Sequence, residues 1–180
     1  MYRPQRQPII LIMNIFSVTR PAPMRAAAMA LGLLCILPPQ SAIAADMITK
    51  LSGEQLTGLM KGWGYKAELS EDDYGDPMIS TATSGAQYKV YFYDCSETKP
   101  KRCDSIMLSA GFIYEQDMEP AIANQWNLDN RYGRAYIDEE GDPILERDIS
   151  LTGGISEANL KEQFRIWDDS LGDFLTAIDW

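Results

Sequence analysis

Two cysteines constrain the fold of this chain more tightly than any other feature. Cys95 and Cys103 enclose a short loop between two runs that are typical of β-strands, Tyr88–Asp94 and Asp104–Phe112. If the cysteines lie directly opposite each other in an antiparallel hairpin, apolar residues face apolar residues across the two strands. The pairs on this apolar face are Val90 with Leu108 and Phe92 with Ile106.

The other face of the predicted hairpin is mixed in polarity, as a hairpin buried on one side requires. It carries Tyr91 and Tyr93, and we expect Cys95 and Cys103 to share it with them. A disulfide between the cysteines would stabilise the fold by about 2–3 kcal/mol in the loop-entropy model. A redox-active pair and a metal site are the alternatives. Catalytic pairs usually lie two residues apart, and two thiolates alone make a poor zinc site.

The C-terminal segment, from Ser156 onward, has the pattern of a long amphipathic helix. Six apolar residues recur at spacings of 4, 3, 4, 3 and 4: Leu160, Phe164, Trp167, Leu171, Phe174 and Ile178. This period places them on one face of the helix. The helix packs either on the sheet of its own chain or against a second copy, because a period near 3.5 also suits a dimer seam.

The remaining pattern predicts helices at 50–62 and 119–127 and strands at 65–69, 78–83, 131–138 and 143–151. Ser52 is a suitable N-cap for the first helix, and Gln55 completes a capping box. Residues 45–180 are therefore expected to form a single α+β domain in the order α-β-β-β-β-α-β-β-α. Its antiparallel sheet should carry helices packed mainly on one face.

The first 44 residues differ from the rest in charge. They contain 4 arginines and no acid, so residues 45–180 hold 16 − 4 = 12 bases and 26 acids, a net charge of −14. The apolar run at 26–37 follows Arg25 and is shorter than the roughly 17–25 residues of a membrane-spanning helix. A basic segment followed by a short apolar run is typical of a signal peptide.

Signal peptidase prefers small residues before its cut, and Ala42 and Ala44 meet this preference. We predict a signal peptide at residues 1–44, cleavage between Ala44 and Ala45, and Met24 as an alternative start. The mature chain should be periplasmic or secreted and have no membrane span. A buried N-terminal helix is disfavoured by Pro38-Pro39, and lipid attachment at Cys35 is disfavoured by the bulky residues before it.

The composition excludes several classes of function. The chain has 0 histidines, which excludes Ser-His-Asp and Cys-His catalysis and histidine-ligated zinc. Its net charge of −10 argues against binding to nucleic-acid phosphates. The remaining acids, serines and glycine pairs match no catalytic or phosphate-binding motif. We predict no catalytic residue, no cofactor and no metal ligand.

Two acidic segments, Glu71–Pro77 and Asp138–Pro143, both contain Gly-Asp-Pro directly before a strand. One interpretation is turn chemistry, since Gly, Asp and Pro are all common turn residues. The other is a cation site, although neither segment has the ligand spacing of an EF-hand loop. Tyr91 and Tyr93 also have two interpretations. They form either a protein-binding patch or a surface that a helix covers.

The stretch Asn124–Gly154 resembles the YbjN family of bacterial proteins, and the resemblance extends more weakly over roughly residues 50–180. It rests on Asn124-Gln125-Trp126-Asn127, Arg131-Tyr132-Gly133-Arg134-Ala135-Tyr136, Asp138-Glu139-Glu140-Gly141-Asp142, Asp148-Ile149-Ser150-Leu151 and Gly153-Gly154-Ile155-Ser156. The resemblance implies a fold like that of type III secretion chaperones, which often dimerise. It also implies a role as a sensory transduction regulator, without known catalytic residues.

We therefore expect an exported, non-enzymatic, protein-binding regulatory domain of the YbjN type. Its partner is an unidentified protein or a second copy in a homodimer, and not a nucleic acid. The alternative is a periplasmic protein that binds a small ligand or a cation through the acidic turns.

Overall fold

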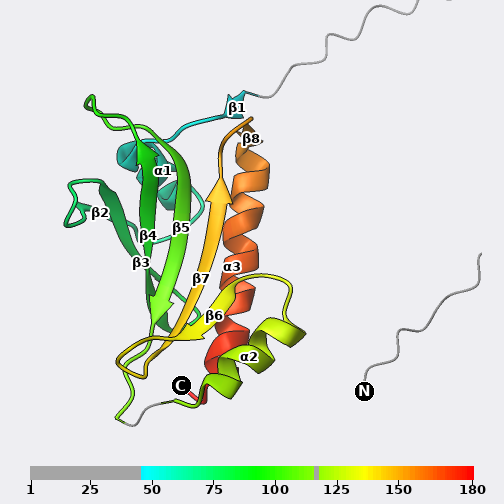
Figure 1. The fold of residues 1–180 in the computed structure, drawn as a ribbon. Coiled ribbons are helices and arrows are strands. Elements are labelled where there is room, and N and C mark those ends of the chain that lie inside the picture. The colour runs from blue at the N-terminus through cyan, green and yellow to red at the C-terminus, as the bar shows by residue number, and fades with distance from the viewer. Residues whose placement is uncertain (1–45, 116–117) are drawn as a thin grey trace, which may run out of the picture. The chain divides into compact units, whose positions relative to one another are not determined.

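The computed structural model describes residues 46–115 and 118–180 (Figure 1). The described residues belong to one compact unit. The predicted signal peptide at 1–44 and its cleavage position between Ala44 and Ala45 lie outside the described residues and stay predictions. In residues 46–115 and 118–180, no helix is long and apolar enough to cross a membrane.

The predicted order of helices and strands is confirmed, with two short strands added. The elements are β1 (Met47–Ile48), α1 (Gly53–Gly62), β2 (Glu68–Glu71), β3 (Pro77–Thr83), β4 (Ala86–Cys95), β5 (Cys103–Gly111), α2 (Pro120–Asp129), β6 (Arg134–Ile137), β7 (Pro143–Ser150), β8 (Ile155–Ser156) and α3 (Glu157–Ala177). The added strands β1 and β8 pair with each other. Two residues are too few for a strand pattern to appear in the sequence.

Six strands form one antiparallel sheet in the order β2-β3-β4-β5-β7-β6. Strands β2, β3, β4 and β5 make the predicted meander, whereas β7 lies between β5 and β6. The hairpin register is also confirmed, because Val90 pairs with Leu108 and Phe92 pairs with Ile106. These four apolar side chains face the same side of the sheet and are buried.

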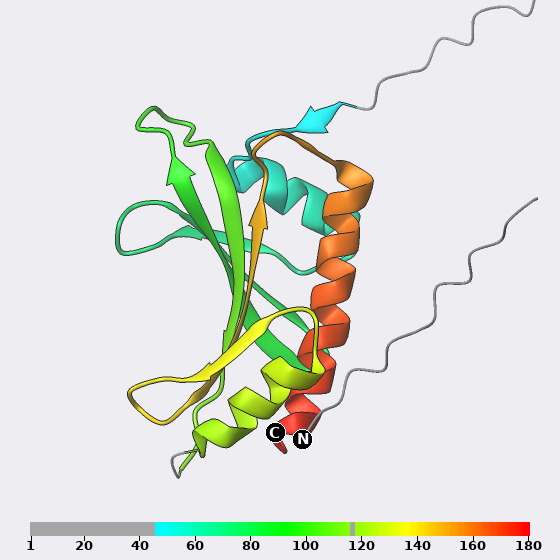
Figure 2. The same cartoon turned by 45° about the vertical axis from the view of Figure 1, so that its right-hand side comes forward.

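The three helices of the described residues, α1, α2 and α3, lie on one side of this sheet (Figure 2). The six stripe residues of the C-terminal helix, from Leu160 to Ile178, are each at most 1% exposed within the single chain. The stripe therefore packs on its own domain, and the interpretation as a dimer seam is wrong. On the same side, Trp126 of α2 meets Phe174 of α3 edge to face, with ring centroids 5.1 Å apart.

The predicted capping box begins α1. The Ser52 hydroxyl accepts a hydrogen bond from the Gln55 amide at 3.3 Å, and the Gln55 side chain accepts one from the Ser52 amide at 3.0 Å. These two bonds satisfy backbone donors that the first helical turn leaves free. Ser156 caps α3 in a similar way through the Asn159 amide.

The two cysteines lie opposite each other at the end of the β4–β5 hairpin and are joined by a disulfide. Cys103 is fully buried, and Cys95 packs against the same core. The expectation that they share the mixed face with Tyr91 and Tyr93 is therefore wrong. Asp94 has φ 55°, in the left-handed region, so the regular alternation of side chains is interrupted just before Cys95.

Candidate functional site

The side of the six-stranded sheet that faces away from the helices is left uncovered by the described elements (Figure 2). We call this surface the open face. The residues that form it lie on all six strands: Glu68, Met78, Ser80, Lys89, Tyr91, Tyr93, Met107, Ser109, Arg134, Tyr136, Glu146 and Asp148. Each alternates along its strand with a residue that points into the core, as the period of a strand requires.

Large apolar side chains occupy the middle of the open face. The register places Met78, Tyr91 and Met107 side by side on β3, β4 and β5. Tyr93 follows on β4 and is 43% exposed. Partial burial raises the pKa of Tyr93, and the carboxylates of Glu146 and Asp148 raise it further. The helices are on the other side of the sheet, so the interpretation that Tyr91 and Tyr93 lie beneath a helix is wrong.

A buried carboxylate lies beside this apolar row. The Glu146 side chain is only 8% exposed, and Arg134 donates to its Oε2 from Nε at 3.1 Å and from Nη2 at 2.6 Å. Its Oε1 accepts from the hydroxyls of Tyr136 at 3.1 Å and Ser109 at 3.4 Å. These bonds compensate the loss of water around the carboxylate. Hydrogen bonding to Glu146 raises the pKa of Arg134.

The Arg134–Glu146 pair was not predicted from the sequence, although a signal for it was present. The acidic turn at Asp138–Pro143 joins β6 to β7, and the two residues are symmetrically placed on either side of it. Pairing Ile137 with Pro143 puts Arg134 directly opposite Glu146. The strand register could therefore have predicted this pair, as it predicted the pairing of Cys95 with Cys103.

Small residues hollow the open face next to Tyr91. Ser80, Ser109 and Gly111 belong to the lining of a depression of about 390 Å³, and Ile144 borders it. A Cβ atom added at Gly111 would lie 2.8 Å from Cδ1 of Ile144, which is too close for an ordinary contact. The open face thus combines large tyrosine and methionine side chains with a recess. Protein interfaces are enriched in such side chains and have complementary shapes.

The two acidic turns have the same hydrogen-bonded structure. Oδ1 of Asp72 accepts from the amides two and four residues further on, both at 2.9 Å. Oδ1 of Asp138 accepts from the corresponding amides at 3.0 and 2.9 Å. Gly75 and Gly141 both have positive φ, at 77° and 86°. The shared Gly-Asp-Pro pattern therefore encodes a turn in which the leading aspartate binds the backbone.

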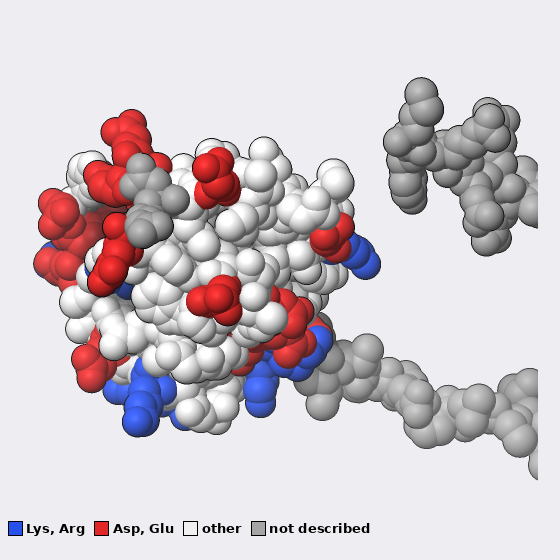
Figure 3. All heavy atoms as spheres, turned by 90° about the horizontal axis from the view of Figure 1, so that it is seen from below, with Lys and Arg blue, Asp and Glu red and all other residues white. Residues whose placement is uncertain are grey.

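Other carboxylates of these turns are also engaged within the chain. Asp76 pairs with Lys101 at 2.6 Å, and Glu71 pairs with Lys99 at 3.3 Å, so the basic disulfide loop neutralises the first turn. Asp142 accepts a backbone amide from the loop before α2 at 2.9 Å. In residues 46–115 and 118–180, no three acidic or cysteine side chains gather as a metal site would require. Acidic side chains nevertheless cluster on one side of the end that holds α2 (Figure 3).

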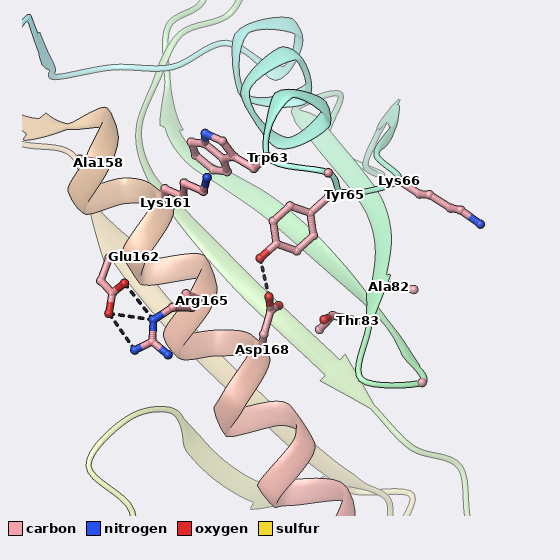
Figure 4. Close-up of a pocket in the computed structure, with 12 residues that line it drawn as sticks. Trp63, Tyr65, Lys66, Ala82, Thr83, Ala158, Lys161, Glu162, Arg165 and Asp168 are labelled. Carbon is pink, nitrogen blue, oxygen red and sulfur yellow. Dashed lines mark hydrogen bonds and ion pairs between the residues drawn. The ribbon is translucent and has the colours of Figure 1, made fainter.

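A cleft of about 670 Å³ opens on the helix side, between the residues after α1, the β3–β4 turn and α3 (Figure 4). Within it, the Tyr65 hydroxyl donates to Oδ2 of Asp168 at 2.5 Å. Burial raises the pKa of Asp168, and burial together with this hydrogen bond raises the pKa of Tyr65. Tyr65 therefore stays protonated at neutral pH, and the pair links the loop after α1 to α3.

No local pattern in the sequence predicts this pair, because the two residues are 103 positions apart. The cleft is also mixed in charge, since Arg165 on its wall is held by Glu162 at 2.8 Å and by Asp169 at 2.6 Å. The residues that line it include no serine or cysteine that could act as a nucleophile.

The comparisons with known proteins agree with this fold. The family model of YbjN, described as a putative bacterial sensory transduction regulator, matches residues 52–180. The chain therefore belongs to the YbjN family. A crystal structure of YbjN from E. coli, described as a putative transcription regulator, aligns with a TM-score of 0.53 at 12% sequence identity. The alignment covers 72% of this chain and 91% of that one. No curated protein matches the chain.

The residues on which the family resemblance rests have clear structural roles in the α2–β6–β7 corner. The Asn127 side chain donates to the Ala135 carbonyl at 2.9 Å and accepts from the Ala135 amide at 2.8 Å. Gly133 has φ 76° and lies against Leu145. These contacts hold β6 at the edge of the sheet and so position Arg134 beside Glu146.

Proposed function

We propose that this protein is an exported regulatory domain that acts by binding another protein chain, without catalysis, through the open face. One observation carries the proposal: a complete sheet face with tyrosine and methionine side chains at its centre is left uncovered by residues 46–115 and 118–180. Such side chains are enriched at protein interfaces. The family description as a regulator supports the same class of function.

Charge supports a protein partner over a nucleic acid. The domain from residue 45 onward has a net charge of −14, from 12 bases and 26 acids. The open face carries two bases: Arg134 is already paired with Glu146, and Lys89 is the single base there without an ion pair among the described residues. A nucleic-acid site would need unpaired cations to neutralise phosphates.

Two features support export. Within the described residues, the strand nearest the N-terminus is β1, which begins at Met47, two residues after the predicted first mature residue Ala45. Signal removal would therefore leave the fold of residues 47–180 intact. The disulfide between Cys95 and Cys103 is of a kind that persists in oxidising compartments.

Site-specific photo-crosslinking in the native host tests the binding proposal. A photoreactive phenylalanine analogue replaces Tyr93, which is 43% exposed on the open face, and Leu128, which is 81% exposed on α2. We expect an adduct at position 93 and none at position 128, the matched control. Adducts at position 128 only, or at neither position, would contradict the proposal.

The export proposal has its own test. The N-terminus of the chain recovered from the cell envelope or the medium is determined by mass spectrometry. We expect it to begin at Ala45, and a cytoplasmic chain that still begins at Met1 or Met24 would rule out the predicted signal peptide.

A further inference from the structure

We propose that the open face binds a second copy of this chain, with the two sheets stacked face to face. The twofold axis runs parallel to the strands, between β4 and β5, at the centre of the six-stranded sheet. This inference rests on the proposed function, because it names the partner of the same surface. It concerns the open face alone, since the apolar stripe of α3 is already buried within one chain.

The strand order fixes which strands meet in such a pair. With the order β2-β3-β4-β5-β7-β6, rotation about this axis places β4 over β5 of the second copy, β3 over β7 and β2 over β6. Residues that lie opposite one another on neighbouring strands form a row across the sheet. Because the axis is parallel to the strands, rotation places each row over the same row of the second copy. The antiparallel register therefore predicts each contact, and the natural twist of the sheets suits this aligned packing.

The apolar row matches itself under this rotation. Tyr91 and Met107 are direct neighbours on β4 and β5, so Tyr91 of one copy lies over Met107 of the other, twice. Methionine is flexible enough to fill the space around an aromatic ring. The centre of the pair is therefore two tyrosine–methionine contacts related by symmetry.

The charges on the open face also match under the rotation. The next row runs Glu68, Ser80, Lys89, Ser109, Glu146 and Arg134 from edge to edge. Rotation places Glu68 over Arg134 of the second copy, whose side chain is 65% exposed. Lys89 lies one strand and one row from Asp148 of the second copy, within reach of a long lysine side chain. Glu68 also lies one strand from Glu146 of the second copy, but the charge of Glu146 is compensated by Arg134. Direct stacking therefore places Glu68 over a base and places no two like charges directly opposite each other.

The size of the surface sets the expected affinity. Five spacings of about 4.8 Å give a width of about 24 Å, and six residue steps of about 3.4 Å give a length of about 20 Å. The pair would bury on the order of 1,000 Å² in total, at the lower end for specific interfaces. We expect a reversible dimer with a dissociation constant on the order of micromolar.

Sedimentation velocity over a concentration series tests the dimer. The purified chain is compared with Tyr91→Glu, on the open face, and with Tyr74→Glu, at a turn tip where the side chain is 90% exposed. We expect Tyr91→Glu to raise the dissociation constant at least tenfold, and Tyr74→Glu to leave it unchanged. Circular dichroism verifies that both variants are folded. The proposal is overturned if the wild-type chain is still monomeric at a protein concentration about 200 times the expected dissociation constant.

A second measurement tests the position of the axis. In the chain that begins at Ala45, which does not contain Cys35, Ser109→Cys lies half a strand spacing from the axis, whereas Ser70→Cys on β2 lies about 12 Å from it. A short bismaleimide should link two copies through position 109 and not through position 70. Dimers that link equally through both positions, or only through position 70, contradict the stacked arrangement.

The photo-crosslinking at Tyr93 separates this inference from the proposed function. An adduct with twice the mass of the chain supports both. An adduct with a different protein, and no dimer in sedimentation, overturns the second copy and leaves the protein-binding function standing. No adduct at position 93 overturns both.

Discussion

The two faces of the six-stranded sheet are built from alternate residues of the same strands, yet they are stabilised in different ways. On the covered face, Val90 and Leu108 are fully buried beneath α3 and its neighbours. On the open face, Tyr91 and Met107 are only partly buried, and the charged pair Arg134–Glu146 lies beside them. One residue step along a strand thus separates a side chain that holds the fold together from one available to a partner.

This comparison predicts that substitutions on the two faces have separable effects. Changes on the covered face should reduce the free energy of unfolding, because they leave cavities in a packed core. Changes on the open face should leave the fold nearly intact and alter association.

Phe164→Ala should lower the free energy of unfolding by about 3–5 kcal/mol, as removal of a buried phenylalanine ring usually does. Phe164 is 0% exposed on α3 and contacts the rings of Trp63 and Tyr65. Urea denaturation measures the change. Tyr93→Ala on the open face is the control and should cost less than about 1 kcal/mol. Equal losses for the two variants would show that the faces do not differ as described.

Reduction of the Cys95–Cys103 disulfide should lower the free energy of unfolding by about 2–3 kcal/mol, because it frees a short loop in the unfolded chain. The disulfide packs on the core at the point where Asp94 interrupts the alternation of the two faces. Urea denaturation with and without a reductant measures the loss. The variant Cys95→Ala/Cys103→Ala should not respond to the reductant, and an equal response from it would contradict this origin.

Arg134→Ala should lower the free energy of unfolding by about 1–2 kcal/mol, because Glu146 then keeps a buried charge without its cation. The loss comes from within the open face, so it tests how far that face contributes to stability. Adding Glu146→Gln to Arg134→Ala should recover part of the loss, since the charge is removed. Arg165→Ala, which breaks only exposed pairs, should cost less than about 1 kcal/mol. No recovery in the double variant would argue against the buried-charge explanation.

The smallest effect concerns pH and Asp168 on the covered side. Because burial raises the pKa of Asp168, the folded chain binds a proton there more readily than the unfolded chain does. The contribution of Asp168 to stability therefore falls as pH rises from its usual pKa through the raised value. Compared with Asp168→Asn, the wild-type chain should gain stability as pH is lowered from about 7 to about 4. If the free energy of unfolding depended on pH in the same way for the two chains, the raised pKa of Asp168 would be contradicted.

Local patterns in the sequence were sufficient for much of the fold. The apolar period of Leu160 to Ile178 and the capping residues Ser52 and Gln55 define helices through near neighbours in the chain. The β4–β5 register also followed from the sequence, because Cys95 and Cys103 are close in the chain and only one pairing keeps the apolar residues together. For the same reason the sequence placed Tyr91 and Tyr93 together on one face of the hairpin, but it left open whether a helix covers them.

Other features depend on residues that only the folded chain brings together. The insertion of β7 between β5 and β6 is a choice among strand orders that share the same local pattern. The burial of Cys103 depends on Asp94 adopting φ 55°, and on Leu51 pairing with Cys103 from a distant part of the chain. Tyr65 and Asp168 likewise meet across 103 positions.

The sequence by itself determined the helices, the strands, their order and the two faces of the central hairpin, because side-chain periodicity acts over a few residues. Only the tertiary structure decided which face is covered. Three helices from separate parts of the chain all pack on one side, where α3 can bury its whole apolar stripe. Among the residues that the structure describes, the same packing leaves the opposite face of the sheet uncovered, and with it the surface that we propose for binding.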